Sequence, residues 1–349
     1  MNIIKTIGFK LNAEAALLLP TIQAYTNAFN FVSQFGFNCN KYNPIHLHNN
    51  TYQETRTLFN LPSQLTCSAR NKASEALRSV ITKRKFKKCP TSKRNCIRYD
   101  ARSYSLFLNK SEVSLSTLTG RQKFPIIISK YHQEYLKNWK IGSADLIVRK
   151  NNQVFLNVTF TKDIADTEQN GKFVGLDRGI KNIAVTSDNK FYTGKHVKRV
   201  SQKYKTLRSK LQQKGTKSAK RHLRKLSGKE KRFKADVNHC ISKSIINNLN
   251  KGDTLVLEDL TGIRAKRLRK TVRTLIHGWS FYQLEQFLKY KAQAEGITLV
   301  HKNACYTSQK CSCCGYTARA NRKTQGSFEC KKCGFKLNAD LNASRNIRN

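Results

Sequence analysis

Hydrophobic and polar positions along the first part of the chain predict one strand followed by two long helices. Residues 2–11 alternate loosely between apolar and polar side chains, which is typical of a strand. Segments 14–35 and 62–84 carry apolar residues at helical spacing. The second of them opens with a proline, which suits the first turn of a helix. We therefore expect a helical insertion over residues 12–85.

The stretch 41–50 between these two helices is polar and rich in Asn and His. It predicts a loop rather than a further helix. His46 and His48 have no Cys or acidic neighbours, so we expect solvated side chains rather than metal ligands.

From residue 96 the hydrophobic period changes to two, which predicts short strands. The segments are Arg98–Asp100, Ser105–Leu108, Val113–Leu115, Pro125–Ile128 and the hairpin of Ala144–Val148 with Val154–Phe160, which turns at Asn151-Asn152. They predict a β-barrel-like sheet that carries the helical insertion. No catalytic motif is visible in this part, and recognition is the role that remains for it.

A polar linker over 163–170 separates this part from a second pattern of apolar strands. Phe173–Asp177 reads as a buried strand that ends in a carboxylate, and 182–186 and 191–192 complete a three-strand meander. Thr254–Asp259 is a later strand, again ending in carboxylates, and Ile297–Val300 is another.

Basic helices connect these strands. Residues 195–235 are dominated by Lys and Arg, contain a single acid, Glu230, and carry an apolar stripe at helical spacing. A second helix continues to Leu249, and Ser280 to Gln283 has the form of a capping box opening a helix that stops near Gly296. A solvated charged face would normally mix signs. One apolar stripe on a basic helix instead favours packing on a core while contacting phosphates.

Net charge narrows the class of partner. The chain has 349 residues, enough for two or three domains, and 66 Lys and Arg against 21 Asp and Glu give a charge of +45. Such a protein needs a polyanion as counter-charge. Nucleic acid is the first candidate and an anionic membrane surface the rival. No run of about eighteen apolar residues predicts a membrane span, so we expect no membrane partner.

The N-terminus does not read as a secretory leader, because its apolar run, 15–19, is too short and follows Glu14. The eleven cysteines are an odd number and do not suggest a secreted disulfide framework. We expect a cytoplasmic protein with reduced thiols, associated with the nucleoid when it binds DNA.

Two Cys-x-x-Cys knuckles, each followed by a glycine, predict a zinc ribbon near the C-terminus. The ligands are Cys311, Cys314, Cys330 and Cys333, which have the spacing of a four-thiolate site for one structural Zn²⁺. Cys313 does not fit, because only one residue separates it from Cys311. The alternatives are a reduced disulfide framework or scattered buried thiols.

Three acids stand at ordered places in the back part of the chain. Asp177 and Glu258 each end a predicted strand, and Asp340 begins a short final helix. Singly they read as a turn residue, a solvated strand end and a helix N-cap. Together they have the layout of a ribonuclease H-like fold. Converging carboxylates need divalent cations between them, and two Mg²⁺ ions about 4 Å apart can activate water for phosphodiester hydrolysis.

Three segments resemble the motifs of RuvC nuclease domains: Val174–Asn182, Leu257–Leu260 and Asn338–Ala343. The stretches Trp279–Leu284 and Ala304–Cys311 are similar to the TnpB family, which comprises transposon-encoded RNA-guided DNA nucleases related to compact type V CRISPR effectors. Asn238–Lys243 and Leu61–Gln64 stand where that family keeps similar motifs. The resemblance is dense from about residue 172 onward.

The resemblance implies an α/β and α+β multidomain fold. It comprises a wedge β-domain over 1–170 with a helical recognition insertion, a RuvC nuclease domain over 171–304, a zinc ribbon over 305–335 that binds target nucleic acid, and a last RuvC segment over 336–349. Asp177, Glu258 and Asp340 would hold two Mg²⁺ ions and cleave DNA. Guide RNA and target DNA are the implied partners, with base pairing supplying most of the specificity. A monomer is favoured over a dimer.

Two features depart from the fuller family pattern: the chain ends three residues after Asn346, and the N-terminal part is small. Both are expected to lower activity or to leave more of the work to the RNA.

Two other functions remain open from the sequence. One is an RNA-guided DNA-binding repressor without cleavage, which the intact acids disfavour. The other is a basic zinc-ribbon protein that binds RNA or ribosomes.

Overall fold

The computed structural model describes residues 2–83, 88–93, 96–130, 132–133, 139–149, 151–163, 168–265, 267 and 269–349. The chain divides into two compact units, Asn2–Asp163 and a second unit that continues to Asn349. The predicted linker residue Asp166 and the predicted helix end at residue 84 lie outside the described residues.

The first unit is built on a seven-stranded sheet in the order β2-β6-β7-β1-β5-β4-β3. Its strands are β1 (Asn2–Leu11), β2 (Cys96–Tyr99), β3 (Tyr104–Phe107), β4 (Glu112–Thr117), β5 (Gly120–Ile127), β6 (Lys140–Val148) and β7 (Val154–Asp163), with a 3₁₀ turn η1 (Leu108–Lys110). All neighbours are antiparallel. The strands predicted from the period of two are confirmed.

Two tyrosines join the ends of this sheet. The hydroxyl of Tyr99 in β2 donates to the carbonyl of Ser116 in β4 at 3.0 Å, and Tyr104 in β3 donates to Gly142 in β6 at 2.6 Å. Both rings are buried. The sheet is therefore nearly closed, as the barrel-like pattern predicted.

Two helices pack on this sheet, α1 (Ala15–Asn38) and α3 (Ser63–Lys83), and α2 (Pro44–Phe59) packs on these two helices. The predicted loop over 41–50 is wrong, since most of it belongs to α2. The side-chain oxygen of Asn43 accepts from the backbone N–H of Ile45 at 2.8 Å, and Pro44 stands in the first turn. His48 is not simply solvated either, because its ring nitrogen contacts Arg70 at 2.6 Å.

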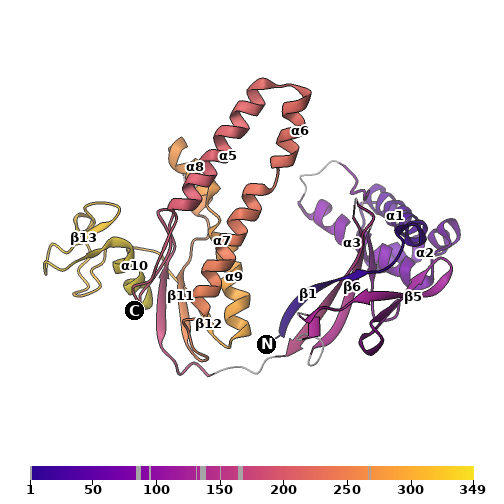
Figure 1. The fold of residues 1–349 in the computed structure, drawn as a ribbon, viewed down its shortest axis with the longest axis horizontal. Helices are drawn as coiled ribbons and strands as arrows, with labels where there is room; N and C mark the ends of the chain where they lie inside the picture. Colours follow the sequence, from indigo (N-terminus) through magenta and orange to yellow (C-terminus); the bar gives the residue numbers. More distant parts are fainter. Residues whose placement is uncertain are drawn as a thin grey trace. The chain divides into compact units, whose positions relative to one another are not determined.

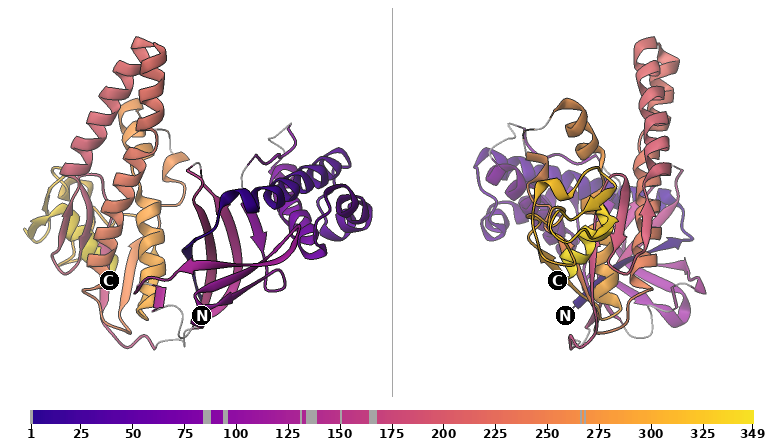
Figure 2. Two further views of the ribbon diagram at one scale, coloured as in Figure 1. Left: turned by 45° about the vertical axis from the view of Figure 1, so that its right-hand side comes forward. Right: turned by 90° about the vertical axis from the view of Figure 1, so that its left-hand side faces the viewer.

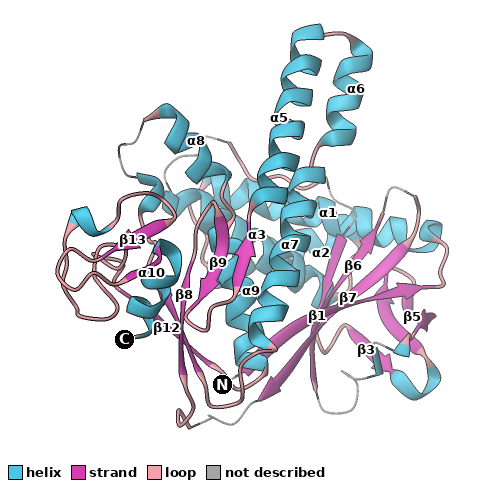
Figure 3. Ribbon diagram, turned by 60° about the vertical axis from the view of Figure 1, so that its left-hand side comes forward, coloured by secondary structure: helices cyan, strands magenta, loops and turns pink. Residues whose placement is uncertain are grey.

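The second unit contains a five-stranded mixed sheet in the order β10-β9-β8-β11-β12. The strands are β8 (Phe173–Asp177), β9 (Asn182–Thr186), β10 (Phe191–Thr193), β11 (Thr254–Glu258) and β12 (Thr298–Lys302). β8, β9 and β10 form the predicted antiparallel meander, whereas β11 runs parallel to both β8 and β12. Figure 3 shows β8 beside the short helix α10 (Ala339–Arg348).

Helices cover both faces of this sheet. α7 (Lys229–Ile246) and α9 (Phe281–Ala294) bury Val174 and Leu176 of β8 on one face. α10 packs on the other face, against β8, β9 and β11. Gly175 makes this approach possible, because a Cβ there would lie 2.0 Å from the carbonyl oxygen of Ser344 in α10.

A basic arm extends from the second unit. α5 (Lys195–Lys214) and α6 (Lys217–Leu226) project beyond the sheet (Figure 1), and both views of Figure 2 show them side by side. The sequence predicted one continuous helix here. It breaks because Gly215 adopts φ +62° and the hydroxyl of Thr216 caps α6 by accepting from the N–H of Ala219.

The remaining elements are α8 (Lys270–Gly278), β13 (Ser327–Glu329), β14 (Lys336–Asn338) and the turns η2 (Ile263–Ala265) and η3 (Arg319–Asn321). The predicted capping box at Ser280 is wrong: the Ser280 hydroxyl accepts from the amide of Asn238 instead of capping α9. Among the described residues, no helix combines the length and apolar character that crossing a bilayer requires.

Candidate active site and metal centre

Strand alternation places two of the three candidate acids on one face of the mixed sheet. Val174 and Leu176 point toward α7 and α9, so the residues between and after them, Gly175 and Asp177, point toward α10. β11 runs parallel to β8 with Val256 opposite Gly175. Continuing that register brings Glu258 opposite Asp177, at the carboxyl ends of adjacent strands.

The third acid comes from the start of α10. Asn338 is the N-cap of this helix, and its side-chain oxygen accepts from the backbone N–H groups of Asp340 at 3.0 Å and Leu341 at 3.3 Å. Asp340 is therefore not the N-cap but stands in the first turn, with 7% of its surface exposed. Since α10 packs on β8, its first turn carries Asp340 to the face where Asp177 lies.

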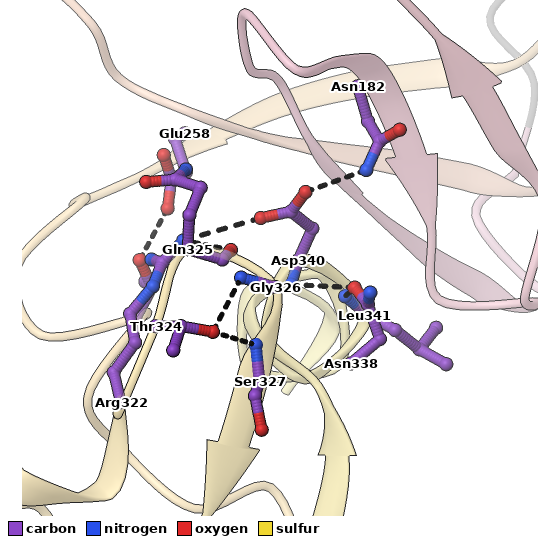
Figure 4. Close-up of polar contacts among 11 residues, drawn as sticks. Asn182, Glu258, Arg322, Thr324, Gln325, Gly326, Ser327, Asn338, Asp340 and Leu341 are labelled. Carbon is purple, nitrogen blue, oxygen red and sulfur yellow. Dashed lines mark hydrogen bonds and ion pairs between the residues drawn. The ribbon is translucent and has the colours of Figure 1, made fainter.

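Both Asp340 and Glu258 have polar partners from other segments (Figure 4). Asp340 accepts a hydrogen bond from the amide of Asn182 at 2.8 Å and an ion pair from Arg322 at 3.3 Å. Glu258 accepts a hydrogen bond from the hydroxyl of Thr307. Strand β9, the ribbon and the loop before it thus all contribute to one polar cluster.

Burial and mutual repulsion raise the pKa values of the strand carboxylates. Desolvation is the main cause for Asp177, and the nearby charges of Glu258 and Asp340 add to it, so its pKa rises to about 8. Burial likewise raises the pKa of Glu258, although the Thr307 hydrogen bond and the charges of Arg178 and Arg322 oppose that rise. Without a bound cation, ionising these buried carboxylates costs free energy. A cation bound between them would reduce that cost.

A buried arginine supports the two strand ends. Arg178 is 3% exposed, and its guanidinium donates to the backbone carbonyl of Glu258 at 2.5 Å and pairs with Glu285 of α9 at 2.5 Å. Its Nε has no hydrogen-bond partner in the described structure. This contact ties the end of β11 to the residue that follows β8, which fixes the spacing of Asp177 and Glu258.

The acids fit a divalent cation by ligand type, since hard cations prefer carboxylate oxygens. Their oxygens do not form one compact ligand set, however. Within the described part of the chain, only the cysteine cluster brings three or more metal-ligating residues within 4.8 Å of one another. Arg322 approaches the same cluster of acids and carries part of the compensating charge.

That cysteine cluster contains Cys311, Cys314, Cys330 and Cys333. The sulfur of Cys311 lies 3.8 Å from that of Cys333, and Cys314 lies 3.5 Å from Cys330. The glycines that follow the knuckles, Gly315 and Gly334, adopt φ +76° and +71°, as the tight turn requires. The scattered-thiol alternative is wrong, and the four sulfurs fit one tetrahedral metal such as zinc. Cys313 is exposed and outside the set.

Two buried asparagines of α10 tie the final helix to the segment before the first knuckle. Asn342 donates to the carbonyl of Lys310 at 2.8 Å and accepts from the N–H of Ser312 at 3.0 Å. Asn346 donates to Thr307 at 2.8 Å and to Lys310 at 2.6 Å. Folding of the ribbon is thereby coupled to the position of Asp340.

Two family models match the chain. The model described as "Probable transposase" (OrfB_IS605) matches residues 155–264, and the model "Cas12f1-like, TNB domain" matches residues 281–347. The first match contains Asp177 and Glu258, and the second contains Asp340 and the four cysteines. Both matches agree with the resemblance of this chain to the TnpB family.

Curated relatives carry related names. A TnpB-like protein of Methanocaldococcus jannaschii is 26% identical over 67% of this chain and 89% of its own. A CRISPR-associated endodeoxyribonuclease Cas12f1 of Syntrophomonas palmitatica is 28% identical over 64% of this chain and 48% of its own, and a putative RNA-guided DNA endonuclease InsQ of Escherichia coli is 28% identical over 50% and 48%. The chain spans about half the length of the latter two.

Solved structures share the fold. A Cas12f1 structure, determined as a complex with sgRNA and target DNA, has a TM-score of 0.63 at 14% identity, covering 96% of this chain and 82% of its own. The RNA-guided endonuclease Cas_phi3 has a TM-score of 0.52 at 10% identity, covering 99% and 92%. At this identity the similarity concerns the fold.

Several residues of the acidic cluster were not assigned a role from the sequence. Arg178, Asn182 and Asn342 stand inside the motifs that carry the TnpB resemblance, so their positions were visible though their contacts were not. Thr307 likewise lies in the stretch Ala304–Cys311, which resembles the family. Arg322 had no sequence signal, because it reaches the acids only through the folding of the ribbon.

Proposed function

We propose that this chain is an RNA-guided DNA endonuclease that hydrolyses phosphodiester bonds at Asp177, Glu258 and Asp340. One observation carries the proposal. Acids from three distant segments meet on one face of the mixed sheet, where burial, with the charges of Glu258 and Asp340 added to it, raises the pKa of Asp177 to about 8. An arrangement that is unfavourable for the chain alone is typical of a site that binds cations.

In this proposal the three carboxylates hold two Mg²⁺ ions, which would activate water and stabilise the leaving oxygen of the phosphodiester. Asp177 and Glu258 supply ligands from the rigid ends of adjacent strands, and Asp340 supplies its oxygen from the first turn of α10. Thr307 orients the Glu258 carboxylate, and Asn182 orients that of Asp340. Arg322, within reach of the same acids, is placed to contact a phosphate there.

The domain assignment follows from the same proposal. Residues 1–170 form the wedge and recognition part, 171–304 the RuvC nuclease domain of the ribonuclease H-like type, 305–335 the zinc ribbon and 336–349 the last RuvC segment. One structural Zn²⁺ on the four cysteines holds the ribbon that positions Arg322. Guide RNA and target DNA are the partners, which the net charge of +45 and the basic arm favour.

Cleavage by the chain with its co-purified RNA tests the proposal. A plasmid that carries a target matched to this RNA should be cut in Mg²⁺ and remain intact in EDTA. Asp177→Ala should abolish cutting while target binding is retained, since the basic surfaces are unchanged. Asp188→Ala removes an exposed acid from the same domain, one that pairs with Lys172, and should cut normally.

Occupancy of the target without cutting by the unaltered chain would contradict the nuclease and support an RNA-guided repressor. Undiminished cutting by Asp177→Ala would exclude this site as the catalytic centre. Association with ribosomes rather than with one small RNA would indicate a basic zinc-ribbon protein that binds RNA or ribosomes.

A further inference from the structure

The face of the mixed sheet opposite α10 carries a second feature that the nuclease proposal does not use. An apolar cavity of about 390 Å³ lies among α5, α7, α8, α9 and the turn that follows β8. Its apolar lining includes Ile180, Ile183, Val197, Leu275, Trp279 and Phe281. We call it the apolar cavity. Its volume is in the range typical of small-molecule sites, about 300–1,000 Å³.

A larger basic cavity of about 830 Å³ adjoins it. The two share several lining residues, among them Arg208, Lys234 and Trp279. The basic cavity adds Lys231, Arg264 and His277. Glu230 is the only carboxylate among its lining residues, and it is already paired with Arg208 and with Lys234. The apolar cavity therefore lies beside a cavity whose lining is mainly positively charged.

The loop 278–280, which lines both cavities, is held in place by three side chains. Lys234 donates to the carbonyl of Gly278, and Arg264 to that of Trp279, each at 3.0 Å. Asn238 donates to the hydroxyl of Ser280 at 3.0 Å. The floor of the cavity is thus preformed, which lowers the entropic cost of binding.

Trp279 brings an aromatic face and an unused donor to this loop. Its ring packs against Phe281 with centroids 4.9 Å apart. Its indole N–H is buried and has no hydrogen-bond partner in the described structure. The aromatic ring is what Trp279 contributes to the cavity lining, and it favours a flat aromatic occupant over a purely aliphatic one.

Two lysines on α5 complete the rim of the apolar cavity. Lys198 and Lys205 line it and are exposed, and no ion pair with a carboxylate of the described residues involves either. The cationic rim and the aromatic wall together match two parts of a nucleotide, namely its phosphate and the π-face of its base.

We propose that the apolar cavity binds the base of an unpaired nucleotide in a nucleic-acid single strand. The phosphates on either side lie on Lys198, Lys205 and the basic cavity. The base stacks on the Trp279 ring. This site lies on the opposite face of the sheet from the carboxylates, so it holds a strand rather than cutting it.

Fluorescence of Trp279 tests the proposal directly. The chain has two tryptophans, so Trp139→Phe leaves Trp279 as the only reporter. This variant is titrated with short RNA and DNA single strands and with abasic strands that carry the same number of phosphates. Base-bearing strands should change the Trp279 emission and bind at least about fivefold more tightly than abasic ones, as base stacking predicts. The tighter of the RNA and DNA arms identifies the strand that supplies the nucleotide.

Matched variants locate the effect, with binding followed by the polarisation of a labelled strand. Val197→Phe fills the cavity and should remove the preference for bases, whereas Val200→Phe, on the same helix but outside the lining, should keep it. If Val197→Phe does not fold, Lys198→Gln with Lys205→Gln should weaken binding more than Lys203→Gln, an exposed lysine outside both cavities. Equal affinity for abasic strands, or an unresponsive Trp279, would overturn the proposal. Neither readout depends on cleavage.

Discussion

At the scale of single residues, the site is a balance between carboxylates and their compensating cations. Asp177 is disfavoured as an anion by burial and by two neighbouring acids, while Arg178 and Arg322 reduce the penalty. The positions of the acids were predictable, because a carboxylate that ends an apolar strand is visible in sequence. The contacts of Arg322 were not, since they depend on how the ribbon folds over α10.

The metal-free chain should lose stability as pH rises through the range in which Asp177 ionises. Its pKa is near 8 in the folded state against 3.8 ordinarily, so the unfolded chain releases this proton first. The carboxyl group therefore imposes no penalty below about pH 4 and its full penalty above about pH 8. Asp177→Asn should raise the melting temperature in EDTA above pH 8, and the gain should vanish toward pH 4.

The control for this measurement is Asp188→Asn, which removes a more exposed acid paired with Lys172. Asp188→Asn should give no gain in melting temperature at alkaline pH. A gain from Asp177→Asn that is the same at every pH would contradict the assigned pKa. Divalent cations should reduce the difference in melting temperature between Asp177→Asn and the unaltered chain, because they stabilise the unaltered chain.

At the scale of elements, close packing of α10 on β8 positions Asp340. Helix and strand were both predicted, but their contact was not, because it depends on the absence of a side chain at Gly175. Helix α2 was missed since the Asn43 cap and Pro44 outweigh a polar composition that suggested a loop. For the basic arm, the sequence predicted one helix where the structure has two. The apolar stripe continues across the break at Gly215, so the pattern does not reveal it.

Gly175→Ala should therefore separate α10 from the sheet. Its Cβ would lie 2.0 Å from the carbonyl oxygen of Ser344 and 2.5 Å from the backbone nitrogen of Arg348, neither of which can rotate away. We expect a loss of about 3 kcal/mol in the free energy of unfolding, measured in urea, together with loss of cleavage. Gly278→Ala, where the added Cβ meets nothing within 4 Å, is the control. Equal stability of the two variants would show that α10 does not pack as described.

A second prediction at this scale concerns metal binding by the four cysteines of the ribbon. Cys314→Ser should lose the bound zinc, because three thiolates remain where a structural site needs four. Cys313→Ser should retain one zinc per chain, since that side chain lies outside the cluster. Metal content of the purified proteins, measured by atomic emission, distinguishes them. Zinc loss from both, or from neither, would be inconsistent with the four-cysteine site.

At the scale of the whole molecule, net charge indicates the class of partner and the comparisons indicate the fold. The net charge of +45 indicated a polyanion before any element was placed, and a solved Cas12f1 structure shares the fold of this chain. The apolar cavity could not have been found from sequence, because its lining comes from four helices and a turn spread over more than a hundred residues.

The most direct test of the account is the binding of Mn²⁺, a spectroscopic substitute for Mg²⁺, followed by electron paramagnetic resonance. The chain loaded with guide RNA and target should bind about two ions per chain at this site. Asp177→Asn, Glu258→Gln and Asp340→Asn should each reduce that number, whereas Asp259→Asn, the exposed acid beside Glu258, should not. If the three variants bind Mn²⁺ as the unaltered chain does, the acids do not form one metal site and the proposed nuclease centre is wrong.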